Sequence, residues 1–276
     1  MDRFSHDGLT FDVVDSGPAD GDVVVLLHGF PQTATSWSKV SKVLTDNGFR
    51  TVAPTQRGYS PGARPRGRRS YRMSALVGDV VELIDQLGAG KVHLVGHDWG
   101  AAVAWSVAAA HPDLVRSLTS VSVPHPGAFL ESMMRSKQIL RSWYMFVFQI
   151  PWLPERAATG RPDGFAGMLT RTGMTRTETE VVRREVLESG ALTGGLNWYR
   201  AMFLSGPKDL QRRVRVPTTH VWSDCDSALD RCGAELAKDY VRADYRLEVM
   251  EGVSHWIPDH RPAELAEIIL ARIARS

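Results

Sequence analysis

One aspartate, Asp98, lies between two glycines in the segment Gly-His-Asp-Trp-Gly at residues 96–100. The apolar run 92–95 precedes this segment and small residues follow it, which predicts a strand, a sharp turn and a helix. That order is typical of a nucleophile elbow, in which the middle residue attacks the substrate. At a helix N-terminus a carboxylate is stabilised by free N–H groups and the helix dipole, and it needs no base to remove a proton. The alternative interpretation is that Asp98 only caps the helix.

The chemistry expected of a carboxylate nucleophile is displacement at a saturated carbon, which leaves an ester on the enzyme. Epoxides and alkyl halides are substrates that suit it. Hydrolysis of the ester requires a base and a group that orients this base. Two late loops offer these groups, and both follow strands whose carboxyl ends would bring them to Asp98. We expect His255 to be the base and Asp226 its orienting acid, with Asp224 as the alternative acid.

Backbone N–H groups complete such a site by stabilising the oxyanion formed during ester hydrolysis. The expected donors are the N–H of Phe30, after the apolar run 22–27, and the N–H of Trp99, after the nucleophile. His28 is interpreted as a structural residue that orders the loop after this run, and His125 is a candidate for the pocket wall. The remaining histidines considered are interpreted as structural: His93, His97, His111 and His220.

Strands and helices alternate in the first part of the chain, which is typical of a parallel sheet with helices on both faces. The expected strands cover 9–14, 22–27, 49–53, 92–95, 115–123, 217–222 and 246–250. The expected helices include 35–47, 73–87, 228–240 and a last helix from residue 262. We therefore expect an α/β fold whose core comprises residues 1–123 and 215–276, with a helical lid (cap) subdomain at 124–214 over the strand carboxyl ends.

The composition is that of a large globular domain of 276 residues. Its 33 basic and 31 acidic residues give a net charge of +2, which argues against nucleic acid as a partner. We recognise no signal peptide and no membrane-spanning run, so a cytoplasmic protein is expected. Cys225 and Cys232 show no metal-ligand spacing. The arginine-rich loop at 64–72 is interpreted as a solvated loop, with steering of an anionic substrate or contact with lipid as the alternative.

The chain resembles the epoxide hydrolases of the α/β-hydrolase superfamily over nearly its whole length. The motifs that carry this resemblance are His-Gly-Phe-Pro at 28–31, Arg-Gly-Tyr-Ser at 57–60, Gly-His-Asp-Trp-Gly at 96–100, the acid loop ending at Asp226, and Gly-Val-Ser-His-Trp at 252–256. The resemblance implies the α/β-hydrolase fold and two lid tyrosines that hydrogen-bond the epoxide oxygen. These match Tyr144, four residues before a Phe-Gln pair, and Tyr199 in Asn-Trp-Tyr-Arg. After the Phe-Gln pair the chain has Ile-Pro-Trp, where the family often has Glu-Pro-Gly.

The reaction implied is hydrolysis of a hydrophobic epoxide to a vicinal diol through an ester on Asp98, with water activated by His255. The two lid tyrosines distinguish this reaction from dehalogenation, because an alkoxide leaving group needs a proton and a halide does not. The expected substrate-binding residues are Trp99, Phe30 and Phe148. No metal or cofactor is expected. The expected partners are the epoxide and water, without nucleic acid or an integral membrane segment, and the protein is expected to be a monomer or homodimer.

Two alternative functions are considered. A haloalkane dehalogenase would share the aspartate and the histidine, and Trp99 resembles its halide-binding indole, but such enzymes commonly carry Asn where this chain has Phe30. Fluoroacetate-type dehalogenases carry Arg after the nucleophile. A non-catalytic ligand-binding protein on the same fold is the other alternative, and the complete set of Asp98, Asp226 and His255 argues against it.

Overall fold

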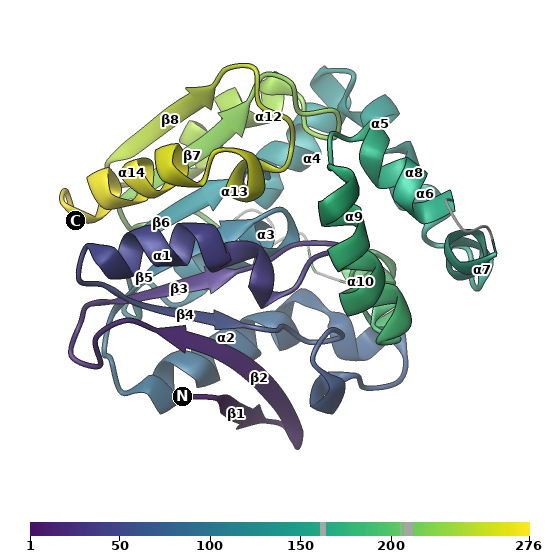
Figure 1. Cartoon of the computed structure of the whole chain (residues 1–276). Helices are drawn as coiled ribbons and strands as arrows, with labels where there is room; N and C mark the ends of the chain where they lie inside the picture. Colours follow the sequence, from purple (N-terminus) through teal and green to yellow (C-terminus); the bar gives the residue numbers. More distant parts are fainter. Residues whose placement is uncertain (161–163, 205, 207–211) are drawn as a thin grey trace.

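A twisted sheet of eight strands organises the part of the chain that the computed structural model describes, namely residues 1–160, 164–204, 206 and 212–276 (Figure 1). The strands are β1 (Arg3–His6), β2 (Leu9–Ser16), β3 (Val23–Leu27), β4 (Arg50–Pro54), β5 (Val92–His97), β6 (Val115–Val121), β7 (Thr218–Ser223) and β8 (Tyr245–Met250). Their order in the sheet is β1-β2-β4-β3-β5-β6-β7-β8. The pairs β1/β2 and β2/β4 are antiparallel and the others are parallel. The predicted mostly parallel sheet is confirmed.

The central strands are apolar because both faces of the sheet are covered. Every residue of β3 and β5 is buried, as expected of strands in the middle of a parallel sheet. In β3, Val24 and Leu26 belong to one core cluster, whereas Val25 and Leu27 belong to the other. Successive side chains of a strand point to opposite faces, so one continuous apolar run supplies both layers of the core.

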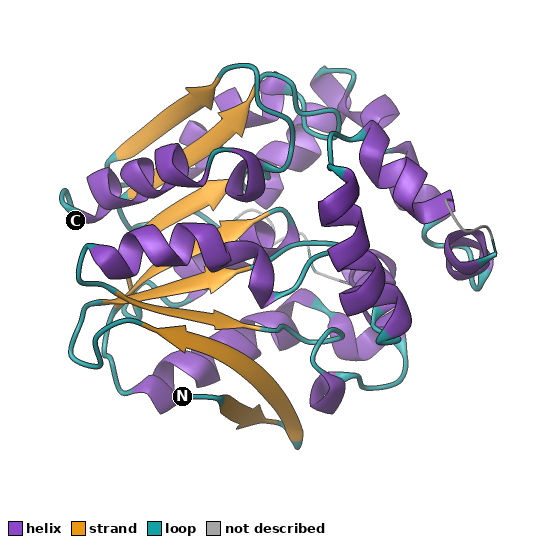
Figure 2. Ribbon diagram, viewed as in Figure 1, coloured by secondary structure: helices purple, strands orange, loops and turns teal. Residues whose placement is uncertain are grey.

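Helices cover the two faces of this sheet (Figure 2). The helices α1 (Ser38–Asp46) and α14 (Pro262–Ile273) contact each other on one face, and α2 (Met73–Leu87) and α3 (Trp99–Ala110) contact each other on the opposite face. This three-layer arrangement brings the carboxyl ends of the parallel strands to one edge of the molecule. A site at that edge can therefore take residues from several strand ends.

A helical insertion, which we define as the residues between β6 and β7, lies beyond this edge (Figure 1). Its elements are α4 (Pro126–Arg135), α5 (Gln138–Arg141), α6 (Trp143–Val147), α7 (Leu153–Thr159), α8 (Gly164–Arg171), α9 (Arg176–Val182), the π-helix η4 (Arg183–Glu188), α10 (Leu192–Ala201) and the 3-10 turn η5 (Met202–Leu204). No strand occurs in the described residues of the insertion. The predicted lid at 124–214 includes residues 161–163, 205 and 207–211, which lie outside the described residues, and its domain boundaries stay a prediction.

Several short elements differ from the sequence-based expectation. The predicted helix at 35–47 begins as a 3-10 turn, η1 (Ala34–Trp37). The predicted helix at 228–240 begins later, at α12 (Arg231–Leu236), because the side chain of Asp230 accepts a hydrogen bond from the Cys232 N–H and so caps the helix there. It continues as the 3-10 turn η6 (Ala237–Tyr240). Elements of three or four residues are too short to show periodicity, so the sequence pattern does not predict β1, η2 (Pro61–Ala63), η3 (Arg68–Tyr71) and α13 (Ile257–His260).

Among the described residues, the structure has no helix that is both long and apolar enough to cross a membrane. The thiols of Cys225 and Cys232 are free, and the Cys225 side chain is exposed.

Candidate active site

The turn between β5 and α3 holds Asp98 in a strained backbone conformation. Its φ is 51° and its ψ is −123°, a combination that non-glycine residues rarely adopt. The turn is tight because two glycines let the backbone close on its neighbours. A Cβ on Gly96 would lie 2.3 Å from the Gly100 carbonyl oxygen, and a Cβ on Gly100 would lie 2.1 Å from the Leu27 carbonyl oxygen. The spacing of the glycines around Asp98 therefore has a steric reason.

The carboxylate of Asp98 points across the site and does not cap its own helix. Its Oδ1 atom accepts a hydrogen bond from the Phe30 N–H at 2.7 Å, and no side-chain hydrogen bond caps α3. Its Oδ2 atom lies 3.6 Å from Nε2 of His255. The helix-cap interpretation is thus wrong. One carboxylate oxygen rests on a backbone donor, and the other faces a histidine.

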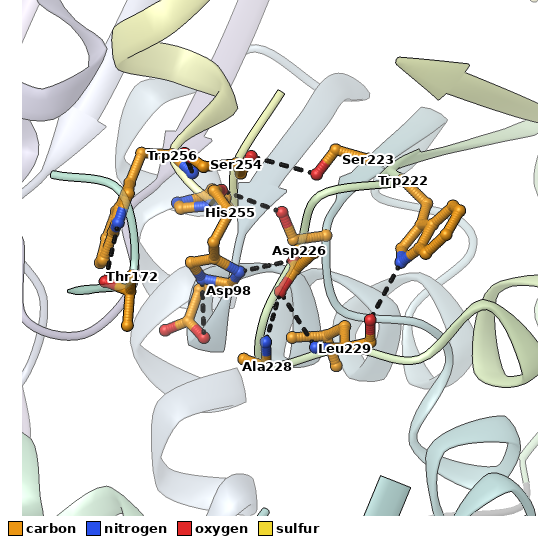
Figure 3. A network of polar contacts seen from close by, with 12 residues as sticks. Asp98, Thr172, Trp222, Ser223, Asp226, Ala228, Leu229, Ser254, His255 and Trp256 are labelled. Carbon is orange, nitrogen blue, oxygen red and sulfur yellow. Dashed lines mark hydrogen bonds and ion pairs between the residues drawn. The ribbon is translucent and has the colours of Figure 1, made fainter. Parts of the chain in front are cut away.

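His255 and Asp226 form the next links of this network (Figure 3). Nδ1 of His255 lies 2.7 Å from Oδ2 of Asp226. The other carboxylate oxygen of Asp226 accepts hydrogen bonds from the N–H groups of Ala228 at 2.8 Å and Leu229 at 3.0 Å. The alternative acid, Asp224, accepts a hydrogen bond from the Gly252 N–H and is exposed. Of the two candidate acids, the structure brings Asp226 to the histidine.

The backbone of His255 is fixed from two sides. Nε2 of His97 lies 2.9 Å from the His255 carbonyl oxygen, so this ring nitrogen carries the proton and donates it. The Ser122 hydroxyl donates to the same oxygen at 3.3 Å. Burial and the neighbouring His255 lower the pKa of His97 to about 4, which keeps its ring neutral at pH 7. His97 is a structural residue, as expected, and it supports the loop that carries His255.

The two carboxylates beside His255 determine the charges in this site. Burial opposes the charged form of His255, but the Asp226 and Asp98 carboxylates outweigh burial and raise the pKa of His255 to about 10. Burial likewise opposes ionisation of Asp98, yet the neighbouring His255, 3.6 Å away, holds the pKa of Asp98 below its usual value. At neutral pH the resting site therefore contains an ionised Asp98 and a protonated His255.

This pairing predicts a specific dependence of stability on pH. Between pH 6.5, the usual pKa of histidine, and pH 10, folded His255 holds a proton that the unfolded chain has lost. The stabilisation is complete below this window, and the free energy of unfolding falls as pH rises through it, by at most about 1.4 kcal/mol per pH unit. Urea unfolding at pH 7, 8 and 9 should show this slope in the wild type and a shallower one in His255→Gln. Equal slopes would contradict the assigned protonation.

An apolar cavity of about 250 Å³ opens in front of Asp98. Its walls combine the core with the helical insertion. Its polar lining groups include the Asp98 carboxylate, the Trp99 indole and the phenols of Tyr144 and Tyr199. The other lining residues are Tyr71, Met73, Leu76, Ala102, Val123, Pro126, Phe129, Leu130, Met145, Trp198, Met202, Phe203 and Leu229. Such a wall excludes water and favours an apolar ligand.

The two lid tyrosines matched from the sequence lie together in this cavity. The rings of Tyr144 and Tyr199 have their centroids 6.1 Å apart, and the Tyr199 ring stands edge-on to Trp99 at 5.0 Å. Burial, followed by the negative charge of Asp98, raises the pKa of both phenols. Both hydroxyls are therefore protonated at pH 7 and available as hydrogen-bond donors.

Phe30 and Phe148 lie one layer behind the cavity. Neither side chain lines it. Both are buried, and their rings pack against Tyr199 with centroid separations of 5.3 Å for Phe30 and 5.0 Å for Phe148. The expectation that these side chains touch substrate is thus corrected: they support the ring of Tyr199. Of the three expected substrate-binding residues, Trp99 lines the cavity.

Two side chains of α5, which the sequence analysis did not single out, hold the acid loop. Gln138 is buried; its Nε2 donates to the Ala228 carbonyl and its Oε1 accepts from the Asp230 N–H, each at 2.7 Å. Arg141 donates to the carbonyl of Asp226 at 2.7 Å. No sequence pattern marks a glutamine or an arginine for such a role, because the contacts depend on how the insertion packs on the core. The insertion therefore helps to position Asp226.

The other histidines lie outside the cavity wall. His28 is fully buried and its Nε2 accepts a hydrogen bond from the Gln56 N–H at 3.0 Å, in agreement with a structural role. His125 is not a pocket residue: its Nδ1 caps α4 at Gly127, and its Nε2 lies 3.0 Å from the Arg212 carbonyl. Among the described residues, no group of three or more His, Cys, Asp or Glu side chains is placed to hold a metal ion.

Comparison with known proteins gives one family match and many relatives. The model of the alpha/beta hydrolase fold family matches residues 22–261. Epoxide hydrolase 3 of Xenopus tropicalis is 35% identical over 278 residues, which cover 97% of this chain and 75% of the relative. The AB hydrolase superfamily protein YfhM of Bacillus subtilis (strain 168) is 35% identical over 271 residues, or 95% of this chain and 94% of the relative. The crystal structure of epoxide hydrolase A from Mycobacterium thermoresistibile superimposes with a TM-score of 0.86 at 26% identity, covering 99% of this chain and 97% of that one.

Proposed function

The chain belongs to the alpha/beta hydrolase fold family, among its epoxide hydrolases, and from this premise we propose that it hydrolyses a hydrophobic epoxide to a vicinal diol through an ester on Asp98. One observation carries the proposal: an ionised carboxylate and two protonated phenols line the same apolar cavity. An epoxide needs a nucleophile at carbon and a proton donor at oxygen, and this cavity offers both.

The first step is ring opening. Oδ2 of Asp98 attacks one epoxide carbon, a carbon–oxygen bond of the ring breaks, and its electron pair stays on the epoxide oxygen. That oxygen receives a hydrogen bond and then a proton from the phenols of Tyr144 and Tyr199. The resulting tyrosinate regains a proton from solvent. The product of this step is a hydroxyalkyl ester of Asp98.

The charge of Asp98 links nucleophilic attack at the epoxide carbon to proton transfer at the epoxide oxygen. The charge of Asp98 is one of the causes that raise the pKa of Tyr144 and Tyr199. As Asp98 becomes an ester its charge disappears, so the phenols become better acids while the alkoxide develops. The same loss removes one of the two carboxylates that hold the proton on His255. His255 can then release this proton to solvent and act as a base.

The second step is hydrolysis of the ester. Neutral His255, oriented by Asp226, takes a proton from water, and the oxygen of this water attacks the carbonyl carbon of the Asp98 ester. The carbonyl oxygen at the Oδ1 position becomes an oxyanion, and the N–H groups of Phe30 and Trp99 stabilise it. Its collapse breaks the bond between the ester carbonyl carbon and Oδ2, which leaves with the diol after taking the proton from His255. Asp98 is left as a carboxylic acid with one oxygen from water, and it gives its proton to His255, which restores the ionised Asp98 and the protonated His255.

The tyrosines are expected to act in the first step alone. Tyr199→Phe and Tyr144→Phe should each slow ester formation by about a hundredfold, the usual size of a lost general acid, and leave ester hydrolysis within about twofold. Rapid-quench measurement of both steps tests this. Tyr71→Phe is the matched control, because Tyr71 lines the cavity but its hydroxyl donates to the Pro65 carbonyl. Equal slowing of both steps in Tyr199→Phe would contradict its role.

The class of leaving group can be tested directly. The purified protein is incubated separately with styrene oxide and with 1-chlorohexane, and diol and chloride are measured. The proposal predicts diol from the epoxide and no chloride above the background. Chloride release without diol would establish the dehalogenase alternative instead, and tight binding of styrene oxide without turnover would establish the ligand-binding alternative.

A further inference from the structure

Exposed apolar side chains concentrate in one segment of the helical insertion, residues 130–153. We define the apolar ridge as Met134, Leu140, Trp143, Phe146, Ile150 and Trp152, all exposed. Trp152 is 74% exposed and Met134 is 82% exposed. Away from residues 130–153, the large apolar side chains of the described chain that are exposed are Val14, Phe203, Leu204 and Val249. Surface apolar patches of this kind mark interaction sites.

The inner faces of the same helices are already occupied. In α5, Gln138 is bound to the acid loop while Leu140 faces outward. In α6, Tyr144 lines the cavity while Trp143 and Phe146 face outward. The ridge is thus the free side of helices that have already made their contacts with the core. Figure 1 shows α5, α6 and α7 at the outer edge of the molecule.

The segment that carries the ridge has a net positive charge. Residues 131–156 contain the cations Arg135, Lys137, Arg141 and Arg156 and the acids Glu131 and Glu155. Glu131 pairs with Arg135 and Glu155 pairs with Arg200, each at 2.8 Å, and Arg141 lies 3.7 Å from Asp230. Lys137 and Arg156 are exposed, and neither forms an ion pair with another described residue. A partner must therefore be apolar where it meets the ridge and anionic around it.

These features favour a lipid surface over a second copy of the chain. Exposed tryptophans beside cations are typical of segments that lie in the interface of a bilayer with anionic headgroups. In a symmetric dimer the same patch faces itself, so two segments of net positive charge would face each other. We propose that the apolar ridge docks on anionic bilayers.

A protein that docks on a bilayer through the ridge would have its cavity next to the lipid. The helices α4 and α6 contribute to both surfaces, since Leu130 and Tyr144 line the cavity. Phe203 lines the cavity and is also 65% exposed, so it connects the wall to the outside. This inference rests on the function proposed above. It narrows the expected substrates to lipophilic epoxides that are dissolved in the bilayer and enter the cavity between the helices of the insertion.

The test is vesicle co-sedimentation with the purified full chain. Vesicles of phosphatidylcholine containing 30 mol % phosphatidylglycerol should bind the wild type, and vesicles of phosphatidylcholine alone should bind it on the order of tenfold less. Trp143→Ser/Trp152→Ser should lower binding by about tenfold or more. The matched control Val14→Ser/Val249→Ser removes two exposed apolar side chains elsewhere and should bind as the wild type does.

The charge requirement is tested with Lys137→Gln/Arg156→Gln. Loss of two cations should weaken binding to anionic vesicles on the order of 30-fold, whereas Arg242→Gln/Arg246→Gln, on another surface, should leave it unchanged. If the Lys137→Gln/Arg156→Gln and Arg242→Gln/Arg246→Gln proteins bound anionic vesicles with equal affinity, the proposal would be overturned. A second pair of results would also overturn the proposal: the wild type does not bind vesicles, and sedimentation velocity shows a dimer that Trp143→Ser/Trp152→Ser converts to a monomer. The ridge would then be an interface between two copies of the chain.

The catalytic assay separates this inference from the proposed function. The ridge variants should hydrolyse a water-soluble epoxide at the wild-type rate, and hydrolyse a lipophilic epoxide in anionic vesicles more slowly than the wild type. Vesicle binding that depends on the ridge, in a protein without any epoxide hydrolysis, would support the docking surface and overturn the proposed function.

Discussion

Replacing Asp98 with asparagine is expected to lower kcat for epoxide hydrolysis by at least about ten-thousandfold. The amide has the shape of the carboxylate and keeps an oxygen for the Phe30 N–H, but it is a far weaker nucleophile. Losses of this size are usual when the nucleophile of a covalent mechanism is removed. Steady-state kinetics with styrene oxide measure the effect, and an unchanged circular dichroism spectrum shows that the variant is folded.

Asp224→Asn is the matched control for this prediction. Asp224 lies on the same loop as Asp226 and accepts a hydrogen bond from the Gly252 N–H, whereas the hydrogen bond to His255 is made by Asp226. Its variant should retain most of the activity. If Asp98→Asn kept a tenth or more of the wild-type kcat, Asp98 would not be the nucleophile.

Replacing His255 with glutamine is expected to trap the ester. Ring opening still proceeds, because Asp98 attacks without a base, whereas hydrolysis loses its general base and should slow by about a thousandfold. Without His255, burial raises the pKa of Asp98, so the reaction is run at pH 8 to keep the carboxylate ionised. We expect a burst of one equivalent of epoxide consumed per protein, followed by very slow turnover.

Mass spectrometry of the His255→Gln protein identifies this intermediate. The intact mass should increase by the mass of one epoxide, and the peptide that contains Asp98 should carry the increase. His111→Gln, at the end of α3, is the control and should show no accumulation. A fully active His255→Gln protein, or a modification on another residue, would contradict the assignment of His255 as the base.

The parts of the site that the sequence predicted are those with strict local requirements. Asp98 is recognisable because the turn after β5 leaves room only for glycine at Gly100, against the Leu27 carbonyl. His255 and Asp226 follow β8 and β7, and parallel strands bring their carboxyl ends to one edge. In each case a short segment, or the strict order of the strands, determines where the side chain lies.

The parts that the sequence did not predict depend on packing between distant segments. The N–H of Phe30 donates to Asp98, and its role as an oxyanion donor stays a prediction; the direction of its ring depends on Tyr199 and Phe148, which come from the helical insertion. The contacts of Gln138 with the acid loop have the same origin. Helices as short as α5 and α6 carry too few turns for periodicity to indicate their buried face.

In the proposed mechanism, the oxygen atom that Asp98 adds to the epoxide carbon leaves with the diol. A single turnover of the wild-type protein, in excess over styrene oxide in heavy-oxygen water, tests it most directly. The covalent mechanism predicts that the first diol contains no heavy oxygen and that the peptide carrying Asp98 gains one such atom. A first diol with one heavy oxygen, and an unlabelled Asp98 peptide, would show that water attacks the epoxide directly and would contradict the covalent mechanism.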